Sequence, residues 1–418
     1  MLLPGLVVAA LALASCAGPA PSAPPSEPPS PAATPTATSS PDDAATYRQI
    51  AAQIAAIRGL DAPDRVEPAV IDRAKLKQNF LEQFDKENSV VEVRRAERIY
   101  QALGLLSQGV SLRDLYLELQ GSQVVGYYDP DAKELFIVSH DGGLGPTERV
   151  TYAHEFTHEL QDHRFDLNSL GLDDLTEDSD RALGILSLVE GDATVTQTAW
   201  MIANLSTAEL GQVAAEASDP NLLEVLARTP AILLETSLFP YSAGATFVAS
   251  LQARGGQAAV DAAFADPPAS TEQILHPEKY AADAAPVSVV MPDDLSARFG
   301  AGWSKVATDT MGELQVRVWL REGGLPGDVA RTAADGWGGD RLTLLDGPAG
   351  AAVLLLATAW DTTADATTFE AAARQAIAGV AKDGRIVRVG SRVVIGLRSG
   401  PSPDDAELDA LLRGLASG

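Results

Sequence analysis

The sequence predicts an α+β protein: a mainly helical region with a small β-sheet, followed by a C-terminal α+β domain. Three observations support this. Residues 46–120 carry apolar side chains at helical spacing, residues 124–139 contain two runs rich in aromatic and β-branched side chains, and strand-like segments become frequent after residue 285. A length of 418 residues also exceeds what one core of ordinary size organises, so two domains are expected.

Four helices are predicted in the first part of the chain. They cover residues 46–60, 69–88, 90–106 and 111–119, and Ser111 is placed to cap the fourth. Two strands follow at 124–129 and 134–139, joined by a short connection that contains Pro130 and Asp131. Further helices are expected at 148–165, preceded by Thr147, and at 181–206, 221–234 and 241–252, which completes a domain spanning residues 46–285.

The C-terminal domain, residues 286–418, combines strand and helix patterns. Residues 314–322 alternate like a strand, 349–361 resemble a buried strand, 364–382 resemble a helix, and 385–399 resemble a hairpin with Gly390 and Ser391 near its turn. The Gly-rich stretch GWGGDR, residues 336–341, lacks the spacing of a nucleotide-binding loop. Substrate binding, occlusion of a cleft and stabilisation of the body are the alternative roles of this domain, and its buried-looking strand and helix favour the structural one by default.

The charge of the chain is strongly acidic. It has 57 acidic and 31 basic residues, a formal net charge of −26. Such a surface argues against nucleic acid as a partner and against docking on anionic lipid through charge alone.

The N-terminus predicts export and anchoring. Residues 1–16 form a short apolar run that ends in Leu-Ala-Ser-Cys, which resembles a bacterial lipobox with Cys16 as the lipidated residue. Residues 1–5 lack the usual positive charge, and a plain secretory signal is the alternative. Residues 17–45 are dominated by Pro, Ala, Ser and Thr, as in an extended tether. We therefore expect a protein held by a lipid anchor at the extracellular face of a bacterial membrane, or else secreted.

The stretch TYAHEFTHELQDH, residues 151–163, carries the strongest chemical signal. His154 and His158 lie four apart, so on a helix both imidazoles face the same side and can ligate one zinc ion. Glu155 lies beside them and is the expected general base, as in the HExxH arrangement. His163 would lie on the opposite side of the helix from His154 and is interpreted as a surface histidine. A polar helix face without metal is the alternative.

Glu190, in SLVEGDAT, is the best candidate for the third ligand. It lies in an otherwise apolar helix, where a carboxylate is costly unless it is paired or bound to metal. Asp192 is a candidate for orienting a ligand histidine, because carboxylates often accept a hydrogen bond from the free ring nitrogen. Solvent-facing positions on an amphipathic helix are the alternative for both acids.

The HEFTH motif followed by an EGDA helix resembles the gluzincin class of zinc metallopeptidases, the thermolysin-like group. The resemblance extends to a bacterial group of secreted or lipid-anchored metallopeptidases, through VVGYYDPDAKELFIV, AHEFTHELQDHRFDL, LVEGDAT, FPYSAGATFV, PPASTEQILHPEKY and GWGGDR. It covers residues 97–365 and implies a zincin-like, mainly helical core. One departure is Thr194, which stands where the thermolysin pattern has an aspartate.

The resemblance implies hydrolysis of peptide bonds, with Zn²⁺ as cofactor and a peptide or protein as substrate. Glu155 would take a proton from the attacking water and pass it to the leaving amine. A further donor is needed for the oxyanion, and Tyr241 and His276 are the two candidates. A core aromatic and a turn histidine are the respective alternatives. An inactive binding or scaffolding lipoprotein is the competing function, which the intact Glu155 disfavours.

Overall fold

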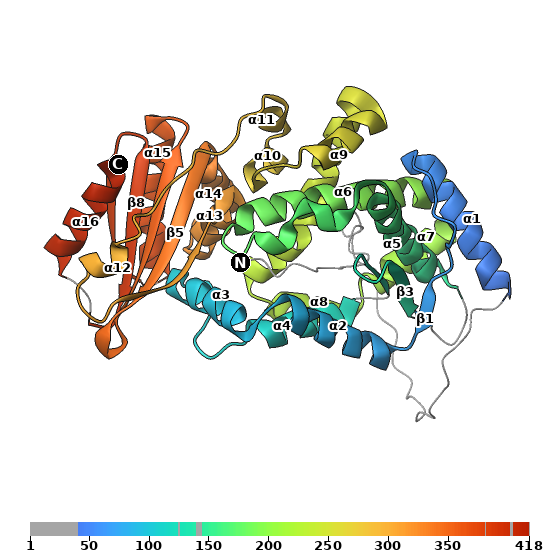
Figure 1. Ribbon diagram of the computed structural model, residues 1–418, viewed down its shortest axis with the longest axis horizontal. Helices are drawn as coiled ribbons and strands as arrows, with labels where there is room; N and C mark the ends of the chain where they lie inside the picture. Colours follow the sequence, from blue (N-terminus) through green and yellow to red (C-terminus); the bar gives the residue numbers. More distant parts are fainter. Residues whose placement is uncertain (1–40, 124–125, 139–143, 381, 402–403, 418) are drawn as a thin grey trace.

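A computed structural model describes residues 41–123, 126–138, 144–380, 382–401 and 404–417. The helical region and the C-terminal sheet lie side by side along the long axis, with the first helix at one end and the last helix at the other (Figure 1). The predicted signal segment, Cys16 and most of the predicted tether lie outside the described residues. None of the described helices has the length and apolar character needed to span a membrane.

The first part of the chain is helical, with a small three-stranded sheet. The helices are α1 (Pro41–Arg58), α2 (Arg73–Glu87), α3 (Val90–Leu103) and α4 (Leu112–Gln123). The strands are β1 (Ala69–Ile71), β2 (Gly126–Asp129) and β3 (Glu134–Val138), in the order β1-β3-β2. The predicted pair of strands is confirmed, because β2 and β3 pair antiparallel.

Two predicted boundaries in this part of the chain differ from those in the structure. The predicted tether ends earlier than residue 45, because α1 begins at Pro41. The helix predicted from residue 69 begins only at Arg73, since Asp72 caps it by accepting from the backbone N–H of Lys75. The three residues before the cap instead form β1, which pairs parallel with β3. Val70 and Ile71 are β-branched, and such residues favour strands.

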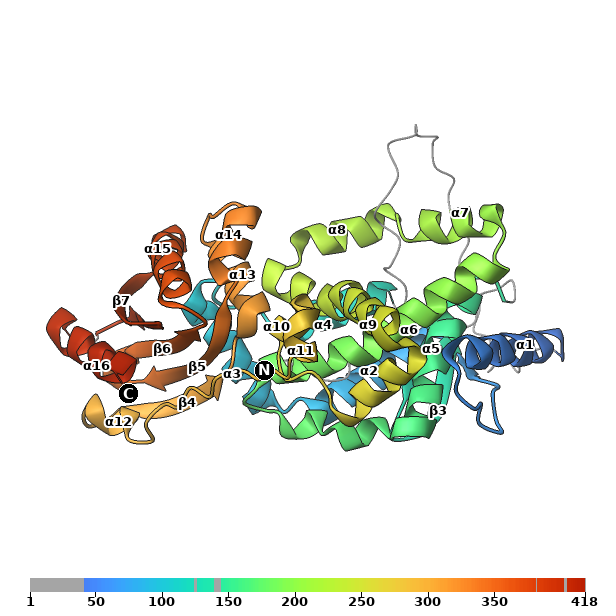
Figure 2. The same ribbon diagram turned by 90° about the horizontal axis from the view of Figure 1, so that it is seen from above.

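The central helices carry the candidate site. They are α5 (Pro146–Phe165), α6 (Ser179–Asn204) and α9 (Ala231–Ala265), and α7 (Thr207–Glu216) and α8 (Pro220–Arg228) connect α6 to α9 along one side of the molecule (Figure 2). The helix predicted at 221–234 is interrupted, because Pro230 separates α8 from α9. The shorter helices α10 (Thr271–Leu275) and α11 (Pro277–Ala281) follow.

Helices α6 and α9 cross at two glycines. A Cβ atom on Gly191 would lie 2.3 Å from the backbone carbon of Gly244, and one on Gly244 would lie 2.2 Å from the carbonyl oxygen of Ser187. There is room for the hydrogen atom of glycine at these two positions but not for a Cβ atom, so the two helices approach more closely than any other residue type would allow.

The C-terminal region contains a five-stranded antiparallel sheet in the order β4-β5-β6-β8-β7. The strands are β4 (Ser304–Asp309), β5 (Trp337–Asp346), β6 (Ala352–Trp360), β7 (Asp383–Val389) and β8 (Arg392–Ser399). The helices are α12 (Leu295–Arg298), α13 (Gly312–Glu322), α14 (Gly327–Ala334), α15 (Thr363–Gly379) and α16 (Asp405–Ser417). The predicted strand, helix and hairpin between 349 and 399 are confirmed, with Gly390 in the left-handed region at the turn.

The strand predicted at 314–322 is wrong, because these residues form α13. Leu314, Val316, Val318, Trp319 and Leu320 are all buried, which places apolar side chains on more than one side of this helix. A helix buried on several sides loses the single apolar stripe from which helical spacing is read. Its alternating apolar positions therefore resembled those of a strand.

The two regions share one hydrophobic core. The largest cluster joins Leu103 and Tyr116 from α3 and α4 to Trp319 of α13 and to Leu354 and Leu356 of β6. A second contact is the indole of Trp319, which donates to the carbonyl oxygen of Leu103 at 3.2 Å. The sequence boundary at residue 285 therefore does not divide the packing of the molecule.

The GWGGDR stretch links these parts through hydrogen bonds. The carboxylate of Asp340 accepts from the backbone N–H groups of Met311 and Gly312, each at 2.9 Å, and so caps the start of α13. It also accepts from the indole of Trp337 at 2.9 Å. Arg341 donates to the carbonyl oxygen of Glu177 at 2.7 Å, just before α6 begins. These contacts connect the stretch to the start of α13 and to the segment before α6.

Candidate metal centre

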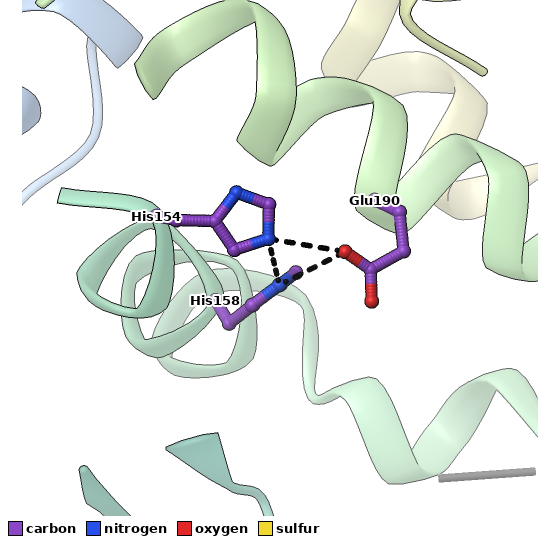
Figure 3. Close-up of side chains that lie close together, drawn as sticks. All are labelled: His154, His158 and Glu190. Carbon is purple, nitrogen blue, oxygen red and sulfur yellow. Dashed lines mark hydrogen bonds and ion pairs between the residues drawn. The ribbon is translucent and has the colours of Figure 1, made fainter. Parts of the chain in front are cut away.

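Helices α5 and α6 bring three predicted ligands together. α5 begins with Pro146 and ends at Phe165, with Asp166 as its C-cap. The middle of this helix is buried on nearly all sides, so its polar side chains lie inside the protein. α6 begins after Asp178, whose side chain accepts from the backbone N–H of Arg181. His154 and His158 of α5 face Glu190 of α6 across this contact, as Figure 3 shows.

The three ligand atoms form a compact triangle. Nε2 of His154 lies 3.1 Å from Oε2 of Glu190 and 3.2 Å from Nε2 of His158, and Nε2 of His158 lies 3.3 Å from the same carboxylate oxygen. The side chains of His154, His158 and Glu190 are only 1%, 7% and 4% exposed. Among the described residues this is the one group of three such side chains placed to hold a metal ion.

Two glutamines set the tautomers of the histidines. The ring Nδ1 of His158 lies 2.9 Å from Oε1 of Gln161, and Nδ1 of His154 lies 3.3 Å from Oε1 of Gln197. The amide orientations follow from their other contacts, since Nε2 of Gln161 donates to the carbonyl of Val189 and Nε2 of Gln197 to that of Val150. In the neutral form of each ring Nδ1 then carries the proton, and the lone pair of Nε2 is the one available to a metal.

These glutamines were not among the predicted site residues. Glutamine carries no motif of its own, but its spacing offered a signal. Gln161 is three residues after His158, and Gln197 is seven after Glu190, so each shares a helix face with a ligand. Asp192 does not contact either histidine directly. Its carboxylate accepts from Nε2 of Gln161 at 2.9 Å and so reaches His158 through that amide.

Glu155 lies beside the triangle with one carboxylate oxygen held. Oε2 accepts from the backbone N–H of Tyr128 in β2 at 3.1 Å, and Oε1 is buried without a hydrogen-bond partner. Burial raises the pKa of Glu155 to about 7. β2 is fixed against α5 a second time, because the hydroxyl of Tyr128 donates to Asp162 at 2.7 Å.

The ligands interact strongly with one another. Burial alone would raise the pKa of Glu190, but the two histidines lower it to about 2. Burial would lower the pKa of His158, but the carboxylate of Glu190 outweighs it and raises this pKa to about 9. In the absence of metal His158 therefore retains a proton, and a metal ion that binds would have to displace it.

The two candidate oxyanion donors lie in different surroundings. Tyr241 of α9 is 7% exposed, and its ring stacks beside that of His154 with centroids 5.9 Å apart. His276 lies between α10 and α11, where its Nε2 is 3.0 Å from Glu313 and 3.7 Å from Asp335. The nearby carboxylate of Glu313 raises the pKa of His276. The structure thus brings Tyr241 to the triad and pairs His276 with the C-terminal region. His163 is exposed, as predicted.

Comparison with known proteins informs only the C-terminal region. Residues 297–408 match a family described as a domain of unknown function, DUF8575. Neither a curated protein nor a solved structure matches the chain. The matched segment contains none of the three side chains of the triangle, so the interpretation of this site depends on its geometry.

Proposed function

We propose that this protein is a zinc metallopeptidase of the gluzincin type. The observation that carries the proposal is the triangle of His154, His158 and Glu190. Ligand atoms at about 2.0–2.1 Å from a tetrahedral zinc ion lie about 3.3 Å apart, close to the separations of 3.1–3.3 Å found here. Two neutral imidazoles and one carboxylate are also the donor set of catalytic zinc sites that keep one position open.

The residues around the triangle suit hydrolysis. Zinc, when bound, would supply a Lewis acid that polarises a carbonyl group and acidifies water. Glu155 has an unpartnered, buried oxygen and a pKa near neutrality, which suits a group that accepts and returns a proton. Tyr241 is the better placed of the two candidates for donating to the oxyanion, because its ring lies against a ligand histidine.

The small sheet offers a place for an extended substrate. β2 is an outer strand of the sheet, and the N–H of its Tyr128 points at Glu155. We propose that a peptide lies along this strand, which would bring its backbone near the centre. The lipid anchor at Cys16 and the extracellular location are further parts of the proposal, supported by the sequence of the N-terminus alone.

Substitution of the base tests the function. Glu155→Gln keeps the size of the side chain and the contact with Tyr128, so zinc should bind as in the wild type. Cleavage of a peptide library should fall by at least about 10²-fold, since a positioned base contributes about that much. Zinc content by metal analysis and cleavage by mass spectrometry are the readouts. Zinc without cleavage in the wild type would instead favour the binding or scaffolding lipoprotein.

A further inference from the structure

Arg58, the last residue of α1, is fully buried and contacts three other helices. Its Nε donates to Oδ2 of Asp192 in α6 at 2.8 Å, and its Nη2 lies 2.7 Å from Oδ1 of Asp261 in α9. Its guanidinium also lies over the ring of Phe165 in α5, 5.9 Å from the centroid. The side chains of Arg58 and Asp192 are both 0% exposed. Buried charges are retained only where partners compensate them, so this pair is a specific feature of the fold.

The pair continues to a metal ligand. Oδ2 of Asp192 receives two donors, Nε of Arg58 at 2.8 Å and Nε2 of Gln161 at 2.9 Å. Oε1 of the same Gln161 amide then lies 2.9 Å from Nδ1 of His158. An unbroken series of buried contacts therefore connects the end of α1 with the imidazole of His158.

From this series we infer that Arg58 is a positioning residue for the metal centre, acting through Asp192 and Gln161 on His158. The inference rests on the metal site of the proposed function and does not depend on peptide hydrolysis. Contacts beyond the ligands typically change metal affinity by about 10–100-fold, which makes the effect measurable.

The amide of Gln161 explains how a distant charge would act. Its NH₂ group is held by Asp192 and by the carbonyl of Val189, and this is what directs its oxygen at His158. If the amide rotated by half a turn, its NH₂ would face Nδ1, and His158 would have to carry its proton on Nε2, where the metal binds. Arg58 holds the carboxylate of Asp192 in the orientation that opposes this rotation.

Zinc affinity measured by competition with a chromophoric chelator tests the inference. Arg58→Met should weaken zinc binding about tenfold or more, and Gln161→Met by a similar or larger factor. Asp192→Asn nearly preserves shape and keeps the test informative if the methionine variant does not fold. Because the residues act in series, the double variant Arg58→Met, Asp192→Asn should lose little more than the larger single loss. Arg58→Lys keeps the charge and should recover part of the affinity.

A matched control separates positioning from general stability. Arg98 of α3 donates to the carboxylate of Asp346 in β5 through both terminal nitrogens, Nη1 and Nη2, away from the centre. Arg98→Met should lower the melting temperature and leave zinc affinity unchanged. The visible spectrum of the cobalt-loaded protein should shift in Arg58→Met and not in Arg98→Met.

Wild-type zinc affinity and an unchanged cobalt spectrum in folded Arg58→Met would overturn the inference. The inference would also be overturned if the losses of zinc affinity in Arg58→Met and Asp192→Asn simply added in the double variant. A wild-type protein that binds zinc but cleaves no peptide would overturn the proposed function and leave this inference intact. A wild-type protein that binds no zinc would overturn both.

Discussion

Each of the two histidines proposed to bind metal faces an amide oxygen through its Nδ1. The grouping of His154 and His158 with Glu190 was expected from the sequence, because the histidine spacing and the apolar setting of Glu190 point to metal binding. The amides of Gln161 and Gln197 were not predicted, since a buried glutamine has many roles and only the folded contacts distinguish them. The same holds for Asp192, whose predicted effect on a histidine passes through one intervening side chain.

Tyr241 and His276 are separated by paired variants. Tyr241→Phe keeps the ring beside His154 and removes the hydroxyl. If that hydroxyl donates to the oxyanion, kcat should fall by about 10²–10³-fold with KM and zinc content nearly unchanged. His276→Ala is the control, because its contacts are with Glu313 and Asp335, and it should leave kcat unchanged. If kcat fell in His276→Ala and not in Tyr241→Phe, His276 would be the oxyanion donor.

Zinc affinity should depend on pH with a defined sign. In the metal-free protein the pKa of His158 is raised to about 9 from 6.5, so this proton stabilises the fold below pH 6.5 and the benefit is lost as pH rises through 9. Zinc requires the neutral ring, so its affinity should rise by about tenfold per pH unit until about pH 9. Competition titrations at several pH values measure this slope. A flat profile would contradict the strong pairing of His158 with Glu190.

At the scale of elements, the sequence predicted most helices and the strand pair but misjudged α13. α5 and α6 are buried nearly all round and were still predicted as helices, so burial alone does not hide a helix. In α13 apolar side chains recur at every second position from Leu314 to Leu320, which matches the spacing of a strand. The start of α2 was also missed, because the cap at Asp72 outweighs the helical pattern of the residues before it.

The crossing of α6 and α9 should tolerate no added side chain. Gly244→Ala would place a methyl group against the carbonyl oxygen of Ser187, which should cost about 1–3 kcal/mol and move α9 away from α6. Tyr241 lies one turn earlier on α9, so activity should fall as well. Urea unfolding and peptide cleavage are the measurements. Gly211→Ala is the control, because that helical glycine of α7 is exposed with open space around it, and it should be neutral or stabilising by up to about 1 kcal/mol. Equal changes in stability and cleavage in Gly244→Ala and Gly211→Ala would contradict the close approach of α6 and α9 at Gly244.

At the scale of the whole molecule, the division into residues 46–285 and 286–418 describes composition better than packing. α3 and α4 pack on the same core as α13 and the five-stranded sheet. In the GWGGDR stretch, Asp340 accepts from the start of α13, and Arg341 donates to the carbonyl oxygen of Glu177 before α6. Sequence patterns report local periodicity and cannot reveal that two segments far apart in the chain share one core.

The shared core predicts a single folding unit. A fragment of residues 41–285 would expose the side chains of α3 and α4 that pack against Trp319 and β6, so it should not fold alone. Near-ultraviolet circular dichroism and hydrogen exchange are suitable measurements. Residues 41–418 are the matched control and should show protected amides and a single unfolding transition. A cooperative transition in the short fragment would show that the two regions are independent.

The two glutamine amides beside the histidines have one more consequence. An amide neither gains nor loses a proton over the range in which proteins are stable, whereas a carboxylate in the same place would become neutral in acid. The amides beside the two ring Nδ1 atoms therefore do not change with acidity themselves. Acid would act on this site through its two imidazoles, through the carboxylate of Glu190 and, behind Gln161, through the carboxylate of Asp192.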